Sequence, residues 1–489
     1  NIAKQLFDNQ NYKSALEEYI LLLKNNNDNI QYLHSAAICL LNTFSDKKQA
    51  VEWLENVTKN PKCDPNAWYD LGRAYQYQYR FDDAINSFQK FLSISKKKDN
   101  NYIPATRQIE MCENAKKLTK NPIDVTFEIL GNEINSSEPD FFPYISEDET
   151  MIIFTSKRSG NTGNNIDYEG FNTSDIFLSE YDNGWKKAKR LTPPVNTSFS
   201  DIVTYMSYDK KNIIIQTDSE KKMGELFYSE LKGKNFSRPI PFSDEINSAF
   251  DETSACLSSD NQFLFFASYR QGGYGAKDIY YCRKLASGDW STPVNIGQNI
   301  NTQYDENFPY ISPDGETLYF CSVGHNSIGG YDIFKSKWDK NNMTFSEPEN
   351  LGYPINTPND ERTISFTKSG RYAYTTYFNP QTKERDIYRV IFNNVEKQYA
   401  VLKGELIKSD SLENTEEKPK NNFNNNYLIT VYNSKNQVYG KYVPNKNTMK
   451  YLIILTPDNY NIKLTENSKI ISEFNIQIAD RENKNCLEI

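Results

Sequence analysis

Residues 305–322 read DENFPYISPDGETLYFCS, and this stretch decides the fold class. An acidic residue opens an apolar segment, a Pro-Asp-Gly turn follows, and a second apolar run comes next. The same order recurs at four other places, as DFFPYIS at 140, DIVTYMS at 201, DETSACLS at 251 and DERTISF at 360. Each copy continues with a loop and then an acidic residue beside an apolar one. The chain therefore contains an internal β-repeat of about 50 to 60 residues.

Four short strands in a repeat of this length are typical of a β-propeller blade. One such sheet cannot bury both faces, whereas sheets stacked around a ring can. The last copy lacks its outer strand, and residues 124–136, DVTFEILGNEINS, resemble the NIGQNINTQ segment that precedes Asp305. We therefore predict that residues 124–395 form a five-bladed β-propeller. Its N-terminal strand completes the last blade and so removes free sheet edges.

Residues 1–120 carry a second periodicity. Ala15, Ala50 and Ala84 lie in similar helical patterns about 34 residues apart, the period of the tetratricopeptide repeat. In the third copy, Gly72 and Ala84 are small enough for two antiparallel helices to approach closely. We predict a tetratricopeptide repeat domain that acts either as a groove for a partner peptide or as a rigid spacer.

Residues 397–489 alternate between apolar and polar positions, as in YLITVYNSKNQVYGKYV and KYLIILTPDNYNIKL. This pattern predicts a small C-terminal β-sandwich. The fold class expected for the whole chain is multi-domain, with an α-helical repeat, a propeller and a second all-β domain.

Composition excludes several functional classes. The chain has 489 residues and a formal net charge of −8, which disfavours nucleic-acid binding. Its seven cysteines form no CxxC pair, so neither structural zinc nor a disulfide framework is expected. The sequence contains no apolar run of eighteen residues. It begins with Asn, and we expect a processed N-terminus. We expect no cofactor.

The loops after the second strand of each copy are long and varied. They read SKRSGNTGNNIDYEGF, SYRQGGYG, SVGHNSIGG and YFNPQTKER. Loops on a rigid scaffold often carry binding residues. Candidate residues for a binding face on these loops are Arg158, Tyr269, Arg270, His325, Asn326, Phe378 and Asn379.

The recurring acidic residues are predicted to be structural, with carboxylates that accept backbone N–H groups at tight turns. They are Asp140, Asp201, Asp251, Asp305 and Asp360 at the first strand, and Asp175, Asp278, Asp332 and Asp386 at the third. An ion site is disfavoured because these positions recur once per blade. His325 lies two residues from Ser327, but no GxSxG elbow surrounds them. We predict no catalytic or metal-binding residue.

Several segments carry a family resemblance. SDIFLSE, GGYDIFKS and LGYPINTPNDER look like TolB-type propeller repeats, and LTPDNYNIKL resembles the turn of a carboxypeptidase-regulatory-like domain. With the helical repeat, this order resembles the PorE-like envelope family associated with type IX secretion. The resemblance implies a periplasmic protein attached to the outer membrane, consistent with a lipoprotein. That family often ends in an OmpA-type peptidoglycan-binding domain, which this sequence lacks, so peptidoglycan binding stays open.

The main functional hypothesis is a non-enzymatic periplasmic scaffold of a secretion or gliding machine. It would bind envelope, secretion-system or outer-membrane proteins through its repeat groove and propeller face. The alternative is a propeller that binds a glycan or a peptide at the outer membrane. An enzyme would require a catalytic constellation, and the sequence shows none.

Overall fold

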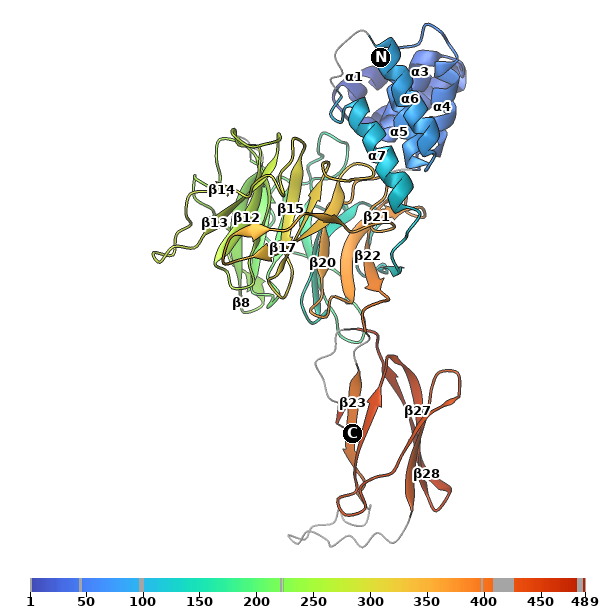
Figure 1. Cartoon of the computed structure of the whole chain (residues 1–489), viewed down its shortest axis with the longest axis vertical. Helices are drawn as coiled ribbons and strands as arrows, with labels where there is room; N and C mark the ends of the chain where they lie inside the picture. Colours follow the sequence, from blue (N-terminus) through green and yellow to red (C-terminus); the bar gives the residue numbers. More distant parts are fainter. Residues whose placement is uncertain are drawn as a thin grey trace. The chain divides into compact units, whose positions relative to one another are not determined.

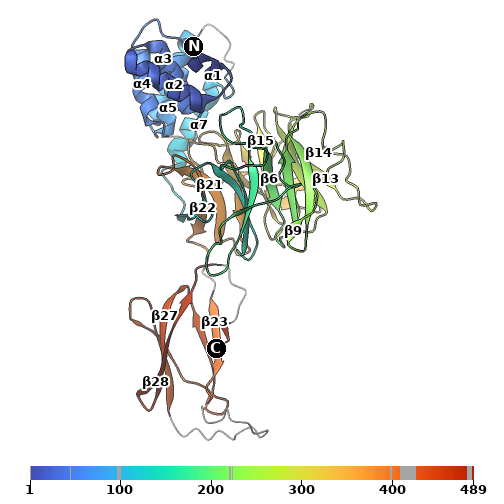
Figure 2. The ribbon, with the colours of Figure 1, turned by 180° about the vertical axis from the view of Figure 1, so that it is seen from behind.

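The computed structural model describes residues 2–43, 46–95, 101–219, 222, 224–396, 399–407, 426–481 and 487–488. It divides into two compact units, Asn1–Phe392 and Asn393–Ile489. Within the first unit, the blue ribbon of the helices and the teal to orange ribbon of the sheets form two groups (Figures 1 and 2). None of the described helices is both long and apolar enough to cross a membrane.

The N-terminal part of the first unit is helical. Its helices are α1 (Ile2–Asp8), α2 (Tyr12–Asn25), α3 (Ile30–Leu41), α4 (Lys48–Thr58), α5 (Asn66–Tyr77), α6 (Phe81–Ile94) and α7 (Ala105–Leu118). Consecutive helices pack on one another. At the α5–α6 contact, a Cβ on Gly72 would lie 2.6 Å from a ring atom of Phe88, which is fully buried. Only glycine permits this approach, as the sequence predicted.

The rest of the first unit consists of five antiparallel sheets. The first contains β2 (Asp140–Ile145), β3 (Met151–Ser156), β4 (Asp175–Glu180) and β5 (Lys189–Arg190). The second contains β6 (Asp201–Met206), β7 (Asn212–Thr217), β8 (Glu225–Lys232) and β10 (Ile240–Pro241), with β9 (Asn235–Phe236) on β8. The third contains β11 (Glu252–Leu257), β12 (Phe263–Ser268), β13 (Asp278–Arg283) and β14 (Val294–Asn295).

The fourth sheet contains β15 (Glu306–Ile311), β16 (Thr317–Ser322), β17 (Asp332–Asp339) and β18 (Thr344–Phe345), with β19 (Glu349–Asn350) on β17. The fifth contains β20 (Ile364–Phe366), β21 (Tyr372–Asn379), β22 (Glu384–Phe392) and β1 (Val125–Ile129). Strands such as β12 are buried on both faces, because a sheet packs on each side. This arrangement is propeller-like.

The inner strands β2, β6, β15 and β20 meet in one hydrophobic core. The rings of Phe142 and Phe308 lie 4.5 Å apart between centroids, and Tyr144 and Tyr310 pack beside them. Aromatic side chains therefore fill the region where the inner strands converge.

The N-terminal strand β1 pairs with the last long strand β22, from Val125 opposite Phe392 to Ile129 opposite Tyr388. This is the pairing that the sequence predicted. Asn135 completes the junction: its amide nitrogen donates to the Ile387 carbonyl at 3.0 Å, and its oxygen accepts from the Ile387 N–H at 2.9 Å. The other four sheets have the same asparagine contact, made by Asn196, Asn247, Asn301 and Asn356.

The described residues of the second unit form two sheets. One contains β26 (Lys450–Leu455), β23 (Ala400–Glu405) and β29 (Leu487–Glu488), and the other contains β25 (Val438–Tyr442), β24 (Tyr427–Tyr432), β27 (Asp458–Glu466) and β28 (Lys469–Ile478). Side chains such as Leu402, Val431 and Ile453 form its core. Within the predicted C-terminal domain, residues 408–425 and 482–486 lie outside the described residues, including Cys486.

The Asn135 contact gives a direct test of the junction between the chain's two distant segments. We expect Asn135→Ala to lower the free energy of unfolding by about 2–4 kcal/mol, because buried backbone groups of Ile387 lose their partners. All five tryptophans lie in the first unit, so their fluorescence during urea unfolding reports on that unit. The exposed neighbour Asn132→Ala is the control. An equal effect of the two substitutions would contradict this role of Asn135.

Candidate functional site

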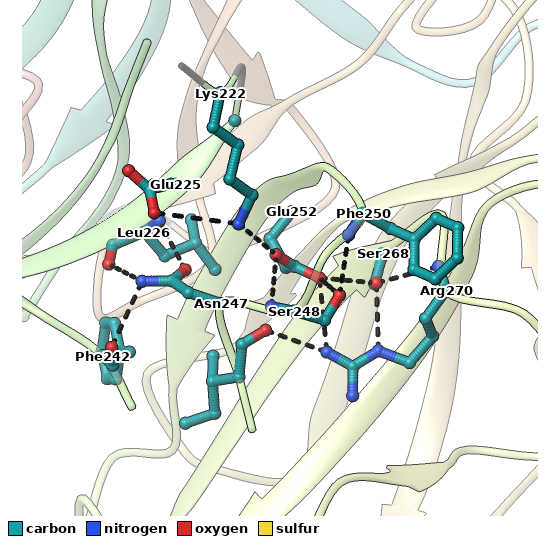
Figure 3. A network of polar contacts seen from close by, with 12 residues as sticks. Lys222, Glu225, Leu226, Phe242, Asn247, Ser248, Phe250, Glu252, Ser268 and Arg270 are labelled. Atoms are coloured by element: carbon teal, nitrogen blue, oxygen red, sulfur yellow. Dashed lines mark hydrogen bonds and ion pairs between the residues drawn. The ribbon is translucent and has the colours of Figure 1, made fainter. Parts of the chain in front are cut away.

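A polar network at the start of each inner strand shapes the loops. In the third sheet it centres on Glu252, whose side chain is fully buried (Figure 3). Its carboxylate accepts hydrogen bonds from the Ser248 N–H at 3.1 Å and the Ser268 hydroxyl at 2.9 Å. Arg270 donates to the Ile246 carbonyl at 2.9 Å, and its guanidinium lies over the Phe266 ring. Arg270 is therefore turned into the sheet.

The same carboxylate position recurs in every sheet, four residues after the N–H group that it accepts. Asp140 and Asp201 occupy it in the first two sheets. In the other three sheets, Glu252, Glu306 and Glu361 take this role, one residue after the aspartates singled out from the sequence. Burial raises the pKa of Asp201 to about 7 and that of Glu306 to about 8.

Because the buried acid stands one residue later in these sheets, Asp305 and Asp360 make other contacts. Asp305 accepts hydrogen bonds from the Tyr102 hydroxyl at 2.6 Å and the Lys277 N–H at 3.2 Å. Asp360 pairs with Arg362 at 2.9 Å. The Ser or Thr four residues upstream of the buried acid is the sequence signal that distinguishes the two positions. An alignment of the five copies on their first acidic residue does not show this signal.

The acidic residues that open the third strands accept hydrogen bonds from the loops that precede them. Asp175 accepts from the Thr162 N–H at 2.8 Å, Asp278 from the Tyr274 N–H at 2.6 Å, and Asp332 from the Ile328 N–H at 3.0 Å. Asp386 accepts from the Asn379 amide. These carboxylates fix the loops that precede their strands.

The predicted binding residues do not come together at one site. Arg158 and His325 contact the carbonyls of Ile134 at 2.7 Å and Ile300 at 2.9 Å, the positions equivalent to the Arg270 contact. Burial lowers the pKa of His325. Asn326 is exposed, and its carbonyl accepts from Asn350. Tyr269 lines the larger of two hollows next to the helices, and Phe378 lines the smaller one.

The larger hollow is a cavity of about 560 Å³ between the helices and the sheet loops. Five tyrosines line it: Tyr69, Tyr77, Tyr102, Tyr269 and Tyr331. Five amide side chains also line it: Asn42, Asn101, Asn359, Gln76 and Gln108. A smaller hollow of about 140 Å³ shares part of this lining and includes Phe378. We call the larger hollow the tyrosine cavity.

Arg107 of α7 holds the two walls of the tyrosine cavity together. Its side chain is buried and donates to the Val323 carbonyl at 3.1 and 2.9 Å. It also donates to the His325 carbonyl and the Ser327 hydroxyl, both at 2.9 Å. Helix α7 is thereby fixed to the loop after β16. No sequence pattern pointed to Arg107, because its partners lie more than 200 residues away.

The tyrosine cavity has an excess of basic side chains. Lys47, Arg73, Lys277 and Arg362 line it, together with the acids Glu169 and Asp360. Both acids already form ion pairs: Glu169 pairs with Lys157 at 2.6 Å, and Asp360 pairs with Arg362 at 2.9 Å. The positive excess stands out on a chain whose net charge is −8.

Lys277 is the least compensated of these bases. Its side chain is 6% exposed, and its ammonium lies 4.7 Å from the ring centre of Tyr269 and 5.9 Å from that of Tyr331. Across the described part of the chain, its ammonium has no hydrogen-bond acceptor and no ion-pair partner. Burial lowers the pKa of Lys277 to about 8, and the pKa of Lys47 falls to about 8 for the same reason.

The fold and the cavity define a propeller-like β protein with a helical segment and a basic, tyrosine-lined cavity between them. No family model and no curated protein matches the chain. Among solved structures, a glycoside hydrolase is similar at 9% identity, covering 57% of this chain and 95% of its own, with a TM-score of 0.40.

Two further similar structures come from named organisms. An α-L-arabinanase of Penicillium chrysogenum complexed with arabinobiose has 10% identity over 55% of this chain and 97% of its own, with a TM-score of 0.36. The periplasmic gluconolactonase of Pseudomonas aeruginosa has 10% identity over 70% of this chain and 86% of its own, with a TM-score of 0.29.

These similar structures correct one expectation from the sequence. We expected a non-enzymatic protein on the grounds of architecture and missing motifs, and that inference is wrong, because the similar structures include a glycoside hydrolase, a gluconolactonase and an arabinanase. A propeller-like architecture therefore gives no reason to exclude catalysis. The likeness is too distant to assign a reaction to this chain.

The burial of the Lys277 ammonium leads to a prediction about the free energy of unfolding. Lys277→Met should raise the free energy of unfolding by about 1–2 kcal/mol at pH 7, because a buried ammonium without an anion is replaced by an apolar chain of similar length. The folded pKa of about 8 lies below the usual 10.5. The destabilisation is therefore complete below pH 8 and fades between pH 8 and 10.5.

Urea unfolding followed by tryptophan fluorescence at pH 7 and pH 10 measures this effect. The exposed Lys234→Met is the matched control and should leave stability nearly unchanged at both pH values. A Lys277→Met protein less stable than wild type at pH 7 would show that the ammonium is stabilised by its surroundings.

Proposed function

We propose that this protein binds a glycan in the tyrosine cavity. The observation that carries the proposal is the lining of the cavity, in which five tyrosines and five amides surround about 560 Å³ of space. Tyrosine rings pack against the C–H faces of sugar rings, while amide and hydroxyl groups hydrogen-bond to sugar hydroxyls. The volume falls within the range of about 300–1,000 Å³ that is typical of small-molecule sites.

The lining favours a glycan over a peptide. Leu41, Ile103, Val323 and Pro358 are the aliphatic and proline side chains among its described residues. An apolar peptide side chain would find few partners there, whereas a polyhydroxylated ligand can satisfy the many amides and hydroxyls. A glycan therefore matches the chemistry of the cavity better.

The proposal includes an architecture. We take the five sheets as the blades of a closed ring and the helices as tetratricopeptide-type repeats. The asparagine contact that recurs in each sheet supports the ring, and so does the pairing of β1 with β22. The close approach of Gly72 to Phe88 supports the repeat.

The scaffold hypothesis has less support. Its partner groove would lie on the inner helices α3 and α5, whose residues Leu41, Tyr69 and Arg73 line the tyrosine cavity. That face is turned toward the loops of the same chain and is joined to them through Arg107. Envelope location and secretion partners stay predictions from the family resemblance.

A glycan array followed by calorimetry tests the proposal. We expect oligosaccharides of two or three sugar units to bind with micromolar affinity. Tyr269→Ala should weaken the binding of the best oligosaccharide about tenfold, because a ring that forms one wall of the site is lost. Tyr274→Ala, which removes an exposed ring near the same loop, is the control.

Two results would overturn the proposal. In the first, no oligosaccharide on the array binds while a peptide from a library does, which would make the cavity a peptide site. The other is a glycan whose affinity is unaffected by Tyr269→Ala, which would place its site elsewhere. Release of reducing ends from a bound oligosaccharide would support the site and add hydrolysis to its function.

A further inference from the structure

We propose that the glycan bound in the tyrosine cavity is an acidic sugar, whose carboxylate pairs with the ammonium of Lys277. This inference rests on the proposed function, since it specifies the chemistry of the ligand in the same cavity. It starts from a buried cation that no carboxylate of the described chain contacts directly.

The position of Lys277 is set by its backbone. Its N–H donates to Asp305 at 3.2 Å, immediately before β13 begins. Its side chain enters the cavity between the rings of Tyr269 and Tyr331. A ring face stabilises an ammonium only in part, and the group lacks the hydrogen bonds that water or a carboxylate would accept.

Nearby carboxylates are engaged elsewhere. Asp305 accepts from the hydroxyls of Tyr102 at 2.6 Å and Tyr331 at 3.2 Å, besides the N–H of Lys277. Asp360 is paired with Arg362 and accepts from the Tyr331 N–H at 3.0 Å. Asp305 and Asp360 are thus held by their own donors, and a carboxylate of the ligand would be the first to contact the Lys277 ammonium directly.

The other bases strengthen the preference for an anion. Lys47 contacts the Asn359 oxygen at 3.5 Å and lies 4.5 Å from the Tyr77 ring centre, so its direct contacts are also uncharged. Arg73 lies 3.6 Å from Asp70. Two lysines with uncharged contacts therefore face one cavity, which raises its affinity for negative charge.

A carboxylate fits this cavity better than a phosphate or sulfate. Phosphate sites commonly present several backbone N–H groups to the ligand. Here two backbone N–H groups of the cavity lining are already engaged, because that of Lys277 donates to Asp305 and that of Tyr331 donates to Asp360. Separate ammonium groups and hydroxyls are left, and they suit a single planar carboxylate.

Calorimetry with matched pairs of disaccharides tests the inference on the full chain. Each pair differs only by oxidation at C6: digalacturonate against galactobiose, cellobiouronate against cellobiose, and dimannuronate against mannobiose. We expect at least one acid to bind about 30-fold more tightly than its neutral partner. Lys277→Met should reduce that ratio to about threefold or less, whereas Lys234→Met should leave it unchanged.

The Lys277→Met protein is expected to be at least as stable as wild type, so its loss of preference cannot be attributed to unfolding. Lys277→Arg retains the charge and should keep part of the preference. The preference for the acid should also decline as salt rises from 20 to about 500 mM, since an ion pair is partly screened.

Three outcomes overturn the inference. If neutral sugars bind as tightly as their acids, glycan binding stands and the acidic class is wrong. If a sulfated disaccharide binds more tightly than every uronate and loses that affinity in Lys277→Met, the anion is not a carboxylate. If no disaccharide of the three pairs binds while neutral oligosaccharides on the array do, the carboxylate assignment also fails.

Discussion

The contact between Asn135 and Ile387 is the constraint on which the first unit depends. It joins residues 252 positions apart and sits beside the pairing of β1 with β22. Helix α7 ends only a few residues before β1, and the Ile123 N–H donates to the Tyr353 carbonyl at 2.8 Å between them. The strand that completes the last sheet therefore also tethers the helices beside the sheet loops. Without this junction, the tyrosine cavity would lose one of its walls.

Two kinds of buried ionisable group occur in the unit, and their surroundings differ. The carboxylates at the strand starts, such as Glu252 and Glu306, receive N–H and O–H donors from their own sheet. These bonds offset desolvation and keep the loops in one conformation. Lys277 and Lys47 instead contact rings or an amide. Structural positions in natural proteins are usually satisfied, whereas unsatisfied ones concentrate where a ligand completes them.

Sequence analysis succeeded where the signal was local or repeated. The five strand patterns, the N-terminal strand and the Gly72–Phe88 approach all follow from periodicity and residue size. The prediction of the buried acid was one residue off in three sheets, because Asp and Glu stand side by side at 251–252, 305–306 and 360–361. The cavity could not be predicted from the sequence either, because Lys47, Arg107 and Lys277 come from segments that only the tertiary fold brings together.

The structure merges two surfaces that the sequence treated as separate. The helical groove and the loop face of the sheets were expected to bind partners independently, yet residues of both line a single cavity. Arg107 joins them through three acceptors on one loop, and Tyr102 adds a hydrogen bond to Asp305. The inner face of the helices is therefore partly covered by loops of the same chain. Under the proposed function, the cavity volume limits the size of the ligand, and the two lysines without a contacting carboxylate favour an acidic one.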